Sequence, residues 1–205
     1  MWLRIPLFGL RVLMKKLILV SLLIAVIVAS SVSSTYVIRR NEIASHRRVV
    51  DQAWSHVNST MQRRADLVPA ALATMKATAA RQPDTVSEVQ KSRNEMQTAA
   101  NPVDVIAASR RLDAAMARLF AGAQYDPDLL VNHRFFVVQE QWAVASNRIA
   151  PERLRYDRAV QDYNAFISGF PNRVFARWAS FTPMENSFTA DADAASRSTA
   201  QLIRK

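Results

Sequence analysis

The sequence predicts an all-α protein in which an N-terminal transmembrane helix is followed by an antiparallel bundle of about four long helices. Apolar residues recur at steps of three and four between Val50 and Ala79, the period of a core-facing or coiled-coil seam. The run from Leu17 to Ile38 carries no charge. Three isolated glycines are too few for a phosphate-cradling loop. The absence of cysteine excludes disulfides and thiolate sites. The seam residues are Val50, Trp54, Val57, Met61, Ala65, Val68, Leu72, Met75 and Ala79.

The N-terminal region divides into a basic leader, residues 1–16, and a transmembrane anchor, residues 17–38. About 22 uncharged residues are enough to span a bilayer as a helix. A cleaved signal peptide is the alternative, because Val28-Ala29-Ser30 offers small residues near a cleavage site. We favour an uncleaved anchor, since the apolar run passes directly into a helical pattern. Met14 is an alternative start, because Lys15 and Lys16 would then precede the apolar run.

Basic residues give the chain a formal charge of +10. Such residues beside a membrane span are ordinary in bacterial membrane proteins, so we expect no nucleic-acid partner. They are balanced around the span, and the positive-inside rule therefore does not choose the side of the soluble domain. Those before the span are Arg4, Arg11, Lys15 and Lys16, and those after it are Arg39, Arg40, Arg47 and Arg48.

A helical bundle is predicted over residues 39–181. Its first helix should continue from the anchor to about Ala80 and form the centre of the bundle. Pro69 lies within this helix, where it lacks a backbone donor and crowds the preceding turn. The sequence therefore predicts either a kink or a helix restart at Pro69.

Pro83 ends the first helix. Asp84 or Thr85 can cap the second, and Glu88 is placed to complete a capping box with Thr85. The second helix, to about Ala99, is the most polar, so we expect it to be peripheral. An Asn-Pro pair at residues 101–102 then ends it, and a third helix follows over residues 103–124. Its inward-facing residues should be Val105, Ile106, Leu112, Met116, Leu119 and Phe120.

A turn at Tyr125–Asp128 supplies aspartates suited to helix capping. The fourth helix begins at Leu129, and Pro151 either kinks it or lies in the first turn of a continuation. Ser168–Pro171 ends that continuation, and a short helical piece follows. Residues 182–205 are expected to be a flexible or loosely helical tail.

Neither a metal site nor a catalytic site can be assigned from residue spacing. His46 and His56 would lie about 15 Å apart along a helix, too far to share a metal ion. Neither a Gly-x-Ser-x-Gly nor a Ser-x-x-Lys string is present to activate a serine. We therefore predict no catalytic residue, no cofactor and no metal.

Several strings occur in an order and at a spacing that are familiar from one family. The most specific are Arg63-Arg64-Ala65-Asp66-Leu67-Val68-Pro69, Tyr163-Asn164 and Phe170-Pro171. Others are Arg40-Asn41-Glu42-Ile43, Ala53-Trp54, Tyr125-Asp126-Pro127-Asp128-Leu129, Gln139-Glu140, Asn147-Arg148-Ile149-Ala150 and Tyr156. Together they resemble the LemA family over roughly residues 41–181. The resemblance implies a bacterial single-pass membrane protein with a long-helix bundle, and it implies no established activity.

The candidate interaction or structural network has two interpretations. The arginines could form a binding patch for an anionic partner, or an interhelical ion-pair network with Glu140 or Asp162, which we favour. Aromatic side chains could line a pocket, but their helical spacing favours the core. The network residues are Arg63, Arg64, Asp66, Pro69, Glu140, Asn147, Arg148, Tyr163 and Asn164. The aromatic residues are Trp54, Phe135, Phe136, Trp142, Tyr156, Tyr163 and Phe166.

These observations favour a non-enzymatic scaffold or adaptor in the bacterial inner (plasma) membrane. Its expected partners are the lipid bilayer and a protein whose identity the sequence does not give. One alternative is an envelope enzyme or a regulatory subunit of a membrane protease. Another is an anionic-lipid binder that uses the leader and the basic residues after the span.

Overall fold

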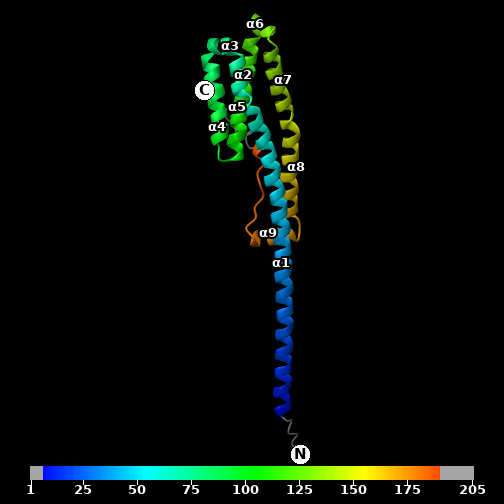
Figure 1. Ribbon diagram of the computed structural model, residues 1–205. Helices are drawn as coiled ribbons and strands as arrows, with labels where there is room; N and C mark the ends of the chain where they lie inside the picture. Colours follow the sequence, from blue (N-terminus) through cyan, green and yellow to red (C-terminus); the bar gives the residue numbers. More distant parts are fainter. Residues whose placement is uncertain (1–6, 190–205) are drawn as a thin grey trace, which may run out of the picture. The chain divides into compact units, whose positions relative to one another are not determined.

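The computed structural model describes the backbone of residues 7–189 and the side chains of Met14 and of residues 16–189. Every regular element in this range is a helix, as Figure 1 shows. The all-α prediction with a long apolar N-terminal helix is therefore confirmed. The helices are α1 (Leu7–Ala65), α2 (Val68–Thr74), α3 (Lys76–Arg81), α4 (Pro83–Thr98), α5 (Pro102–Ala123), α6 (Pro127–Leu130), α7 (His133–Asn147), α8 (Ile149–Ser168) and α9 (Asn172–Trp178).

The described chain forms two compact units, and the first joins the N-terminal part of α1, up to Ser45, with Ile167–Thr182. Residues 16–35 of α1 are exposed on every side. An 18-residue window in this helix has a mean hydropathy of 2.5 and is not buried at all. The structure therefore contains one N-terminal helix that is long and apolar enough to cross a membrane.

The second unit contains His46–Phe166 and the chain from Pro183 onward. Its part of α1 buries a single stripe, as the heptad-like spacing predicted. All six residues that were expected to face inward from α5 are buried. The buried apolar residues of α1 in this unit are Val50, Val57, Met61 and Ala65, and Arg64 is buried as well.

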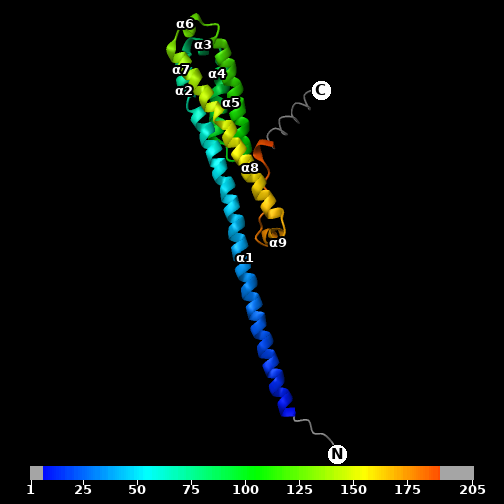
Figure 2. The same cartoon turned by 90° about the vertical axis from the view of Figure 1, so that its right-hand side faces the viewer.

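The polar helix α4 is not merely peripheral, because it packs along α5 (Figures 1 and 2). It buries Val89, Ser92 and Met96 against its neighbours. Its charged side chains reach across to α5 at the edge of this contact, where Arg111 donates to Glu95 over 2.6 Å. A helix with few apolar residues is thus held by a narrow stripe and flanking ion pairs.

The predicted single helix to Ala80 is interrupted twice. α1 ends at Ala65, and α2 begins at Val68 with Pro69 in its first turn. At that position the missing proline N–H has no carbonyl to bond within the helix, so Pro69 marks a restart and not a kink. Arg93 Nε donates to the Ala65 carbonyl over 3.2 Å and so satisfies one acceptor at the end of α1. The second interruption is at Met75.

The capping box at Thr85 was a wrong prediction. α4 begins at Pro83, two residues earlier, and its N-cap Gln82 makes no side-chain cap. Glu88 instead forms an ion pair with Arg118 of α5. The prediction of capping aspartates in the following turn is confirmed, because Asp126 Oδ1 accepts a hydrogen bond from the Asp128 N–H at the start of α6.

The second proline, Pro151, lies in the first turn of α8, which ends at Ser168 as expected. Within the second unit, the first described residues of the predicted tail are packed and not loose. Asn164 binds the backbone of Met184 with both side-chain atoms, each over 2.8 Å, and Phe188 is buried. The predicted leader up to Pro6 and residues 190–205 of the predicted tail lie outside the described residues.

Candidate functional site

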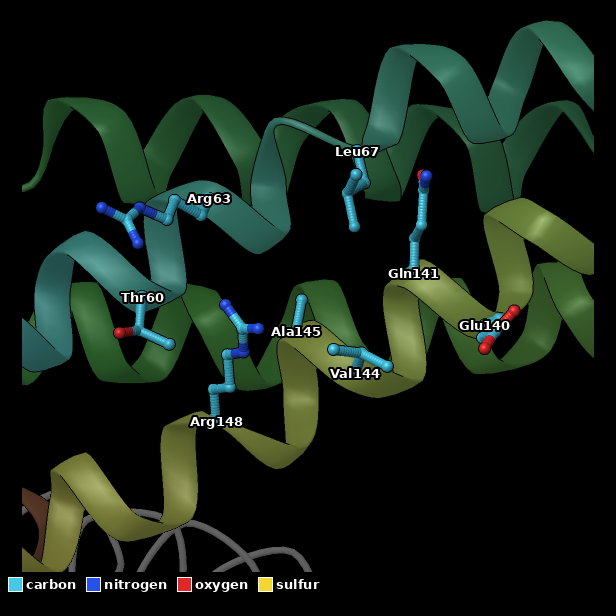
Figure 3. Close-up of a pocket in the computed structure, with 8 residues that line it drawn as sticks. All are labelled: Thr60, Arg63, Leu67, Glu140, Gln141, Val144, Ala145 and Arg148. Carbon is cyan, nitrogen blue, oxygen red and sulfur yellow. The ribbon is translucent and has the colours of Figure 1, made fainter.

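Two hollows open beside the last turns of α1 in the second unit. The first has a volume of about 350 Å³ and lies between the end of α1 and α7 (Figure 3). We call it the Arg63 hollow. It is lined by Thr60, Arg63, Leu67, Glu140, Gln141, Val144, Ala145 and Arg148.

The Arg63 hollow has an apolar floor and charged ends. Figure 3 shows Arg63 and Arg148 at one end, Glu140 at the other, and Val144 with Leu67 between them. The two arginines and the glutamate are exposed, and Val144 is 45% exposed. Two cations and one anion around an apolar floor suit an apolar group that carries negative charge beside it.

The second hollow, which we call the Arg64 hollow, has a volume of about 400 Å³. Its central feature is the Arg64 side chain, which is only 4% exposed. Its guanidinium is 2.5 Å from Asp113 Oδ1, and its Nη2 donates to Ser109 Oγ over 2.7 Å. The hollow is lined by Met61, Arg64, Ile106, Ser109, Arg110, Asp113, Ser146, Ile149, Ala150, Arg153 and Phe188.

Burial dominates the electrostatics of this ion pair. Desolvation lowers the pKa of Arg64, and the attraction of Asp113 opposes that change. Desolvation likewise raises the pKa of Asp113 against the attraction of Arg64. The Arg64 guanidinium also lies over the Trp142 ring, 5.4 Å from its centroid. The buried charge of Arg64 therefore depends on Asp113, whose own side chain is 42% exposed.

A second pair of opposite charges ties α3 to α6. Arg81 donates to Asp126 Oδ2 over 2.7 Å, and Thr78 donates to the same oxygen over 3.2 Å. The hydrogen bond from Arg81 is the main reason why the pKa of Asp126 is lowered. These contacts fix the turn before α7, which carries one wall of the Arg63 hollow.

Tyr163 is fully buried, and burial raises its pKa while the hydrogen-bonded Arg47 guanidinium opposes that rise. The neighbouring Asn164 holds Met184, as described above. Tyr156, two turns before Tyr163, is paired with Ser187 at 3.1 Å. The Tyr-Asn string thus lies in the packing of α8 against α1 and the segment after Pro183, away from both hollows.

The structure brings together three of the candidate network residues, Arg63, Glu140 and Arg148, in one hollow. It places Arg64 in the other hollow, where Arg64 forms an interhelical ion pair, but with Asp113 and not with the suggested Glu140 or Asp162. The remaining candidates are dispersed. Asp66 and Asn147 are exposed, and Pro69 lines a separate hollow between α2 and α4.

The true partners of Arg64 were missed, although the sequence held a signal for them. Ser109 and Asp113 are four residues apart on α5, which places them on one face of that helix. They adjoin the apolar stripe, so their polar groups needed a partner from a neighbouring helix. Of the seven aromatic residues, Phe135, Trp142, Tyr156 and Tyr163 are buried in the core, while Phe136 is 48% exposed.

Comparison with known families gives a match over residues 53–202 to the LemA family. The chain belongs to the LemA family. The matched residues include both hollows, the whole of α2 to α9 and the segment after α9. No curated protein matches this LemA-family chain. In the part of the chain that the structure describes, no cluster of three or more histidine or carboxylate side chains is suited to hold a metal ion.

Proposed function

We propose that this LemA-family protein is a single-pass protein of the bacterial inner membrane whose bundle is a non-enzymatic scaffold or adaptor. The Arg63 hollow is its docking site for a partner protein. One observation carries the proposal: an apolar floor that includes the exposed Val144 lies between two exposed arginines at one end of the hollow and the exposed Glu140 at the other.

The anchoring half of the proposal is supported by the first half of α1. Its residues 17–29 are apolar apart from Ser21, and within the described part of the chain their side chains are exposed on every face. A helix that is apolar all round is stable in hydrocarbon, because its backbone is bonded internally and its side chains need no water. Exposure of so many adjacent apolar residues to water would instead cause aggregation.

The chemistry of the Arg63 hollow indicates what the partner presents. An apolar side chain would cover Val144 and Leu67, and adjacent carboxylates would approach Arg63 and Arg148. Burial of one apolar side chain contributes about 1.5–3 kcal/mol. Each exposed ion pair adds up to about 1 kcal/mol. Such a site suits a short acidic and apolar segment that binds reversibly, as an adaptor requires.

Site-specific crosslinking in cells tests the docking site. A photo-crosslinking amino acid replaces Val144 in the full-length protein, and the matched control position is Val131, which is 84% exposed on the same unit. We expect a discrete protein adduct at position 144, and its loss when Arg63→Glu and Arg148→Glu are combined. An adduct that is equally strong at position 131, or that survives the charge reversal, would contradict a docking role for the hollow.

Extraction of membranes with alkaline carbonate tests the anchor separately. The full-length protein should stay with the membrane pellet, because residues 17–38 cross the hydrocarbon region. Release of the protein into the supernatant would show that it is not anchored by α1.

A further inference from the structure

The outer face of α9 carries an unusual combination of residues. Arg173, Val174, Arg177 and Trp178 share one side of this seven-residue helix and line a hollow of about 370 Å³. Trp178 is 63% exposed and Val174 is 40% exposed. Phe170, just before the helix, is 90% exposed. We call these five residues the α9 face.

Large apolar side chains in such positions are costly in water. The opposite side of α9 is buried through Ala176, so the helix cannot turn its exposed side inward. Trp178 is further held by Phe175, with the rings edge to face and their centroids 5.9 Å apart. The α9 face is therefore a fixed feature of the first unit and not a set of loose side chains.

The first unit places α9 beside α1, as Figures 1 and 2 both show. The residues of α1 are exposed on every side up to Thr35, and at Tyr36, Arg39 and Ile43 one stripe becomes covered. A helix that enters the hydrocarbon at Leu17 leaves it after about 20 residues. The end of the apolar run thus coincides with the part of α1 against which α9 can pack.

The residue types of the α9 face match this level of a bilayer. Tryptophan is enriched at the boundary between hydrocarbon and head groups, where its ring is apolar and its N–H remains hydrated. Arg173 and Arg177 are four residues apart, so both guanidinium groups can approach one phosphate. Residues 168–181 include no aspartate or glutamate that would repel an anionic lipid.

We propose that the α9 face is a second membrane contact that binds anionic phospholipid. Phe170, Val174 and Trp178 enter the head-group region, and Arg173 with Arg177 bind lipid phosphate. The inference rests on the membrane anchor of the proposed function. A second contact beside the anchor fixes the rotation of α1 about its own axis in the bilayer.

The absence of cysteine from the chain allows a direct test. Val174→Cys in the full-length protein carries a nitroxide, and the protein is reconstituted into vesicles of phosphatidylglycerol and phosphatidylcholine. Accessibility to oxygen and to a nickel chelate, measured by electron paramagnetic resonance, reports the depth of the label. Val131→Cys, on the second unit, is the matched control for an exposed valine.

We expect the label at position 174 to be accessible to oxygen and shielded from nickel, with the reverse at position 131. Arg173→Gln combined with Arg177→Gln should shift position 174 toward the aqueous values in anionic vesicles. Aqueous values at position 174 in the unmodified face would overturn the inference, and so would an unchanged depth after the arginine substitutions. Phe170→Cys provides a second labelled position if Val174→Cys lowers the helical content.

Flotation of the same vesicles separates this inference from the proposed function. Protein that floats with the vesicles while its label at position 174 remains aqueous retains the anchor and contradicts the α9 contact; the face would then be open to a protein partner. Protein that does not float contradicts the anchor and, with it, the inference.

Discussion

The Arg63 hollow and the Arg64 hollow share α1 and the end of α7, but the Arg64 hollow is also lined by α5 and α8, and the two differ in character. Consecutive residues of α1 point about 100° apart, which sends two neighbouring arginines to different sides of the bundle. Arg63 is exposed beside an apolar floor. Arg64 is 3% exposed and is enclosed by Asp113, Ser109 and Trp142.

This difference separates the two interpretations of the arginine pair. A buried guanidinium is useful to the fold when its partners are in place, because an unpaired charge at that depth is very costly. An exposed guanidinium contributes little to stability and remains accessible to a ligand. Of the two consecutive arginines, Arg64 therefore supports the fold, and Arg63 offers a charge to a docking partner.

The comparison predicts its largest effect at Arg64. Arg64→Ala should lower the free energy of unfolding by about 1.5–3 kcal/mol, because it removes the buried guanidinium that binds Ser109 and the partly exposed Asp113. Chemical denaturation of the full-length protein in detergent, followed by circular dichroism, measures this loss. Arg64→Met combined with Asp113→Leu is the informative control, since removal of both charges should restore much of the stability. A single substitution that costs less than about 1 kcal/mol would place Arg64 with Arg63 as a surface residue.

Asp113 is expected to give a smaller, pH-dependent effect. Its pKa is raised in the folded state by burial, so this group favours folding below its ordinary pKa near 3.8 and loses that contribution as the pH rises through the folded pKa. Asp113→Asn should remove this decline from the pH dependence of stability. Unfolding measured at a series of pH values between about 3 and 7 tests it. If Asp113→Asn left the pH dependence of stability unchanged, Asp113 would have the same pKa in the folded and the unfolded chain.

Asp126 should show the opposite sign. Its pKa is lowered, chiefly by the hydrogen bond from Arg81, so its contribution is present above pH 3.8 and is lost as the pH falls through the folded pKa. Asp126→Asn should therefore reduce the loss of stability that occurs below pH 3.8. Asp113→Asn should instead change the stability above pH 3.8. If the free energy of unfolding changed with pH in the same way in both variants, neither carboxylate would have a pKa set by its own contacts.

Much of the fold could be predicted because it depends on local spacing. The apolar stripes of α1 and α5 and the break at Pro83 are visible in a single stretch of sequence. The break before Pro69 was visible too, but the choice between kink and restart depends on where α1 stops. Contacts such as the one from Arg93 to the Ala65 carbonyl contribute to that end.

The sites were harder to predict, because they depend on pairs of residues far apart in the chain. Arg64 and Asp113 meet only after α1 and α5 have packed. The helical spacing of apolar residues does not show whether Arg64 pairs with Asp113 or with Glu140. The amphipathic pattern of α9 is too short to show which side is covered. Its exposed face becomes evident when α9 is placed beside α1.

The smallest expected effect on stability is at Arg63, and it tests the comparison most sharply. Arg63→Gln should change the free energy of unfolding by no more than about 0.5 kcal/mol, because water already solvates the exposed guanidinium. The same substitution should still weaken the protein adduct formed from position 144, since it removes a charge at one end of the hollow. Denaturation and crosslinking of this one variant measure both. A loss of stability similar to that of Arg64→Ala, or an adduct of undiminished strength, would show that the adjacent arginines do not divide structure and docking between them.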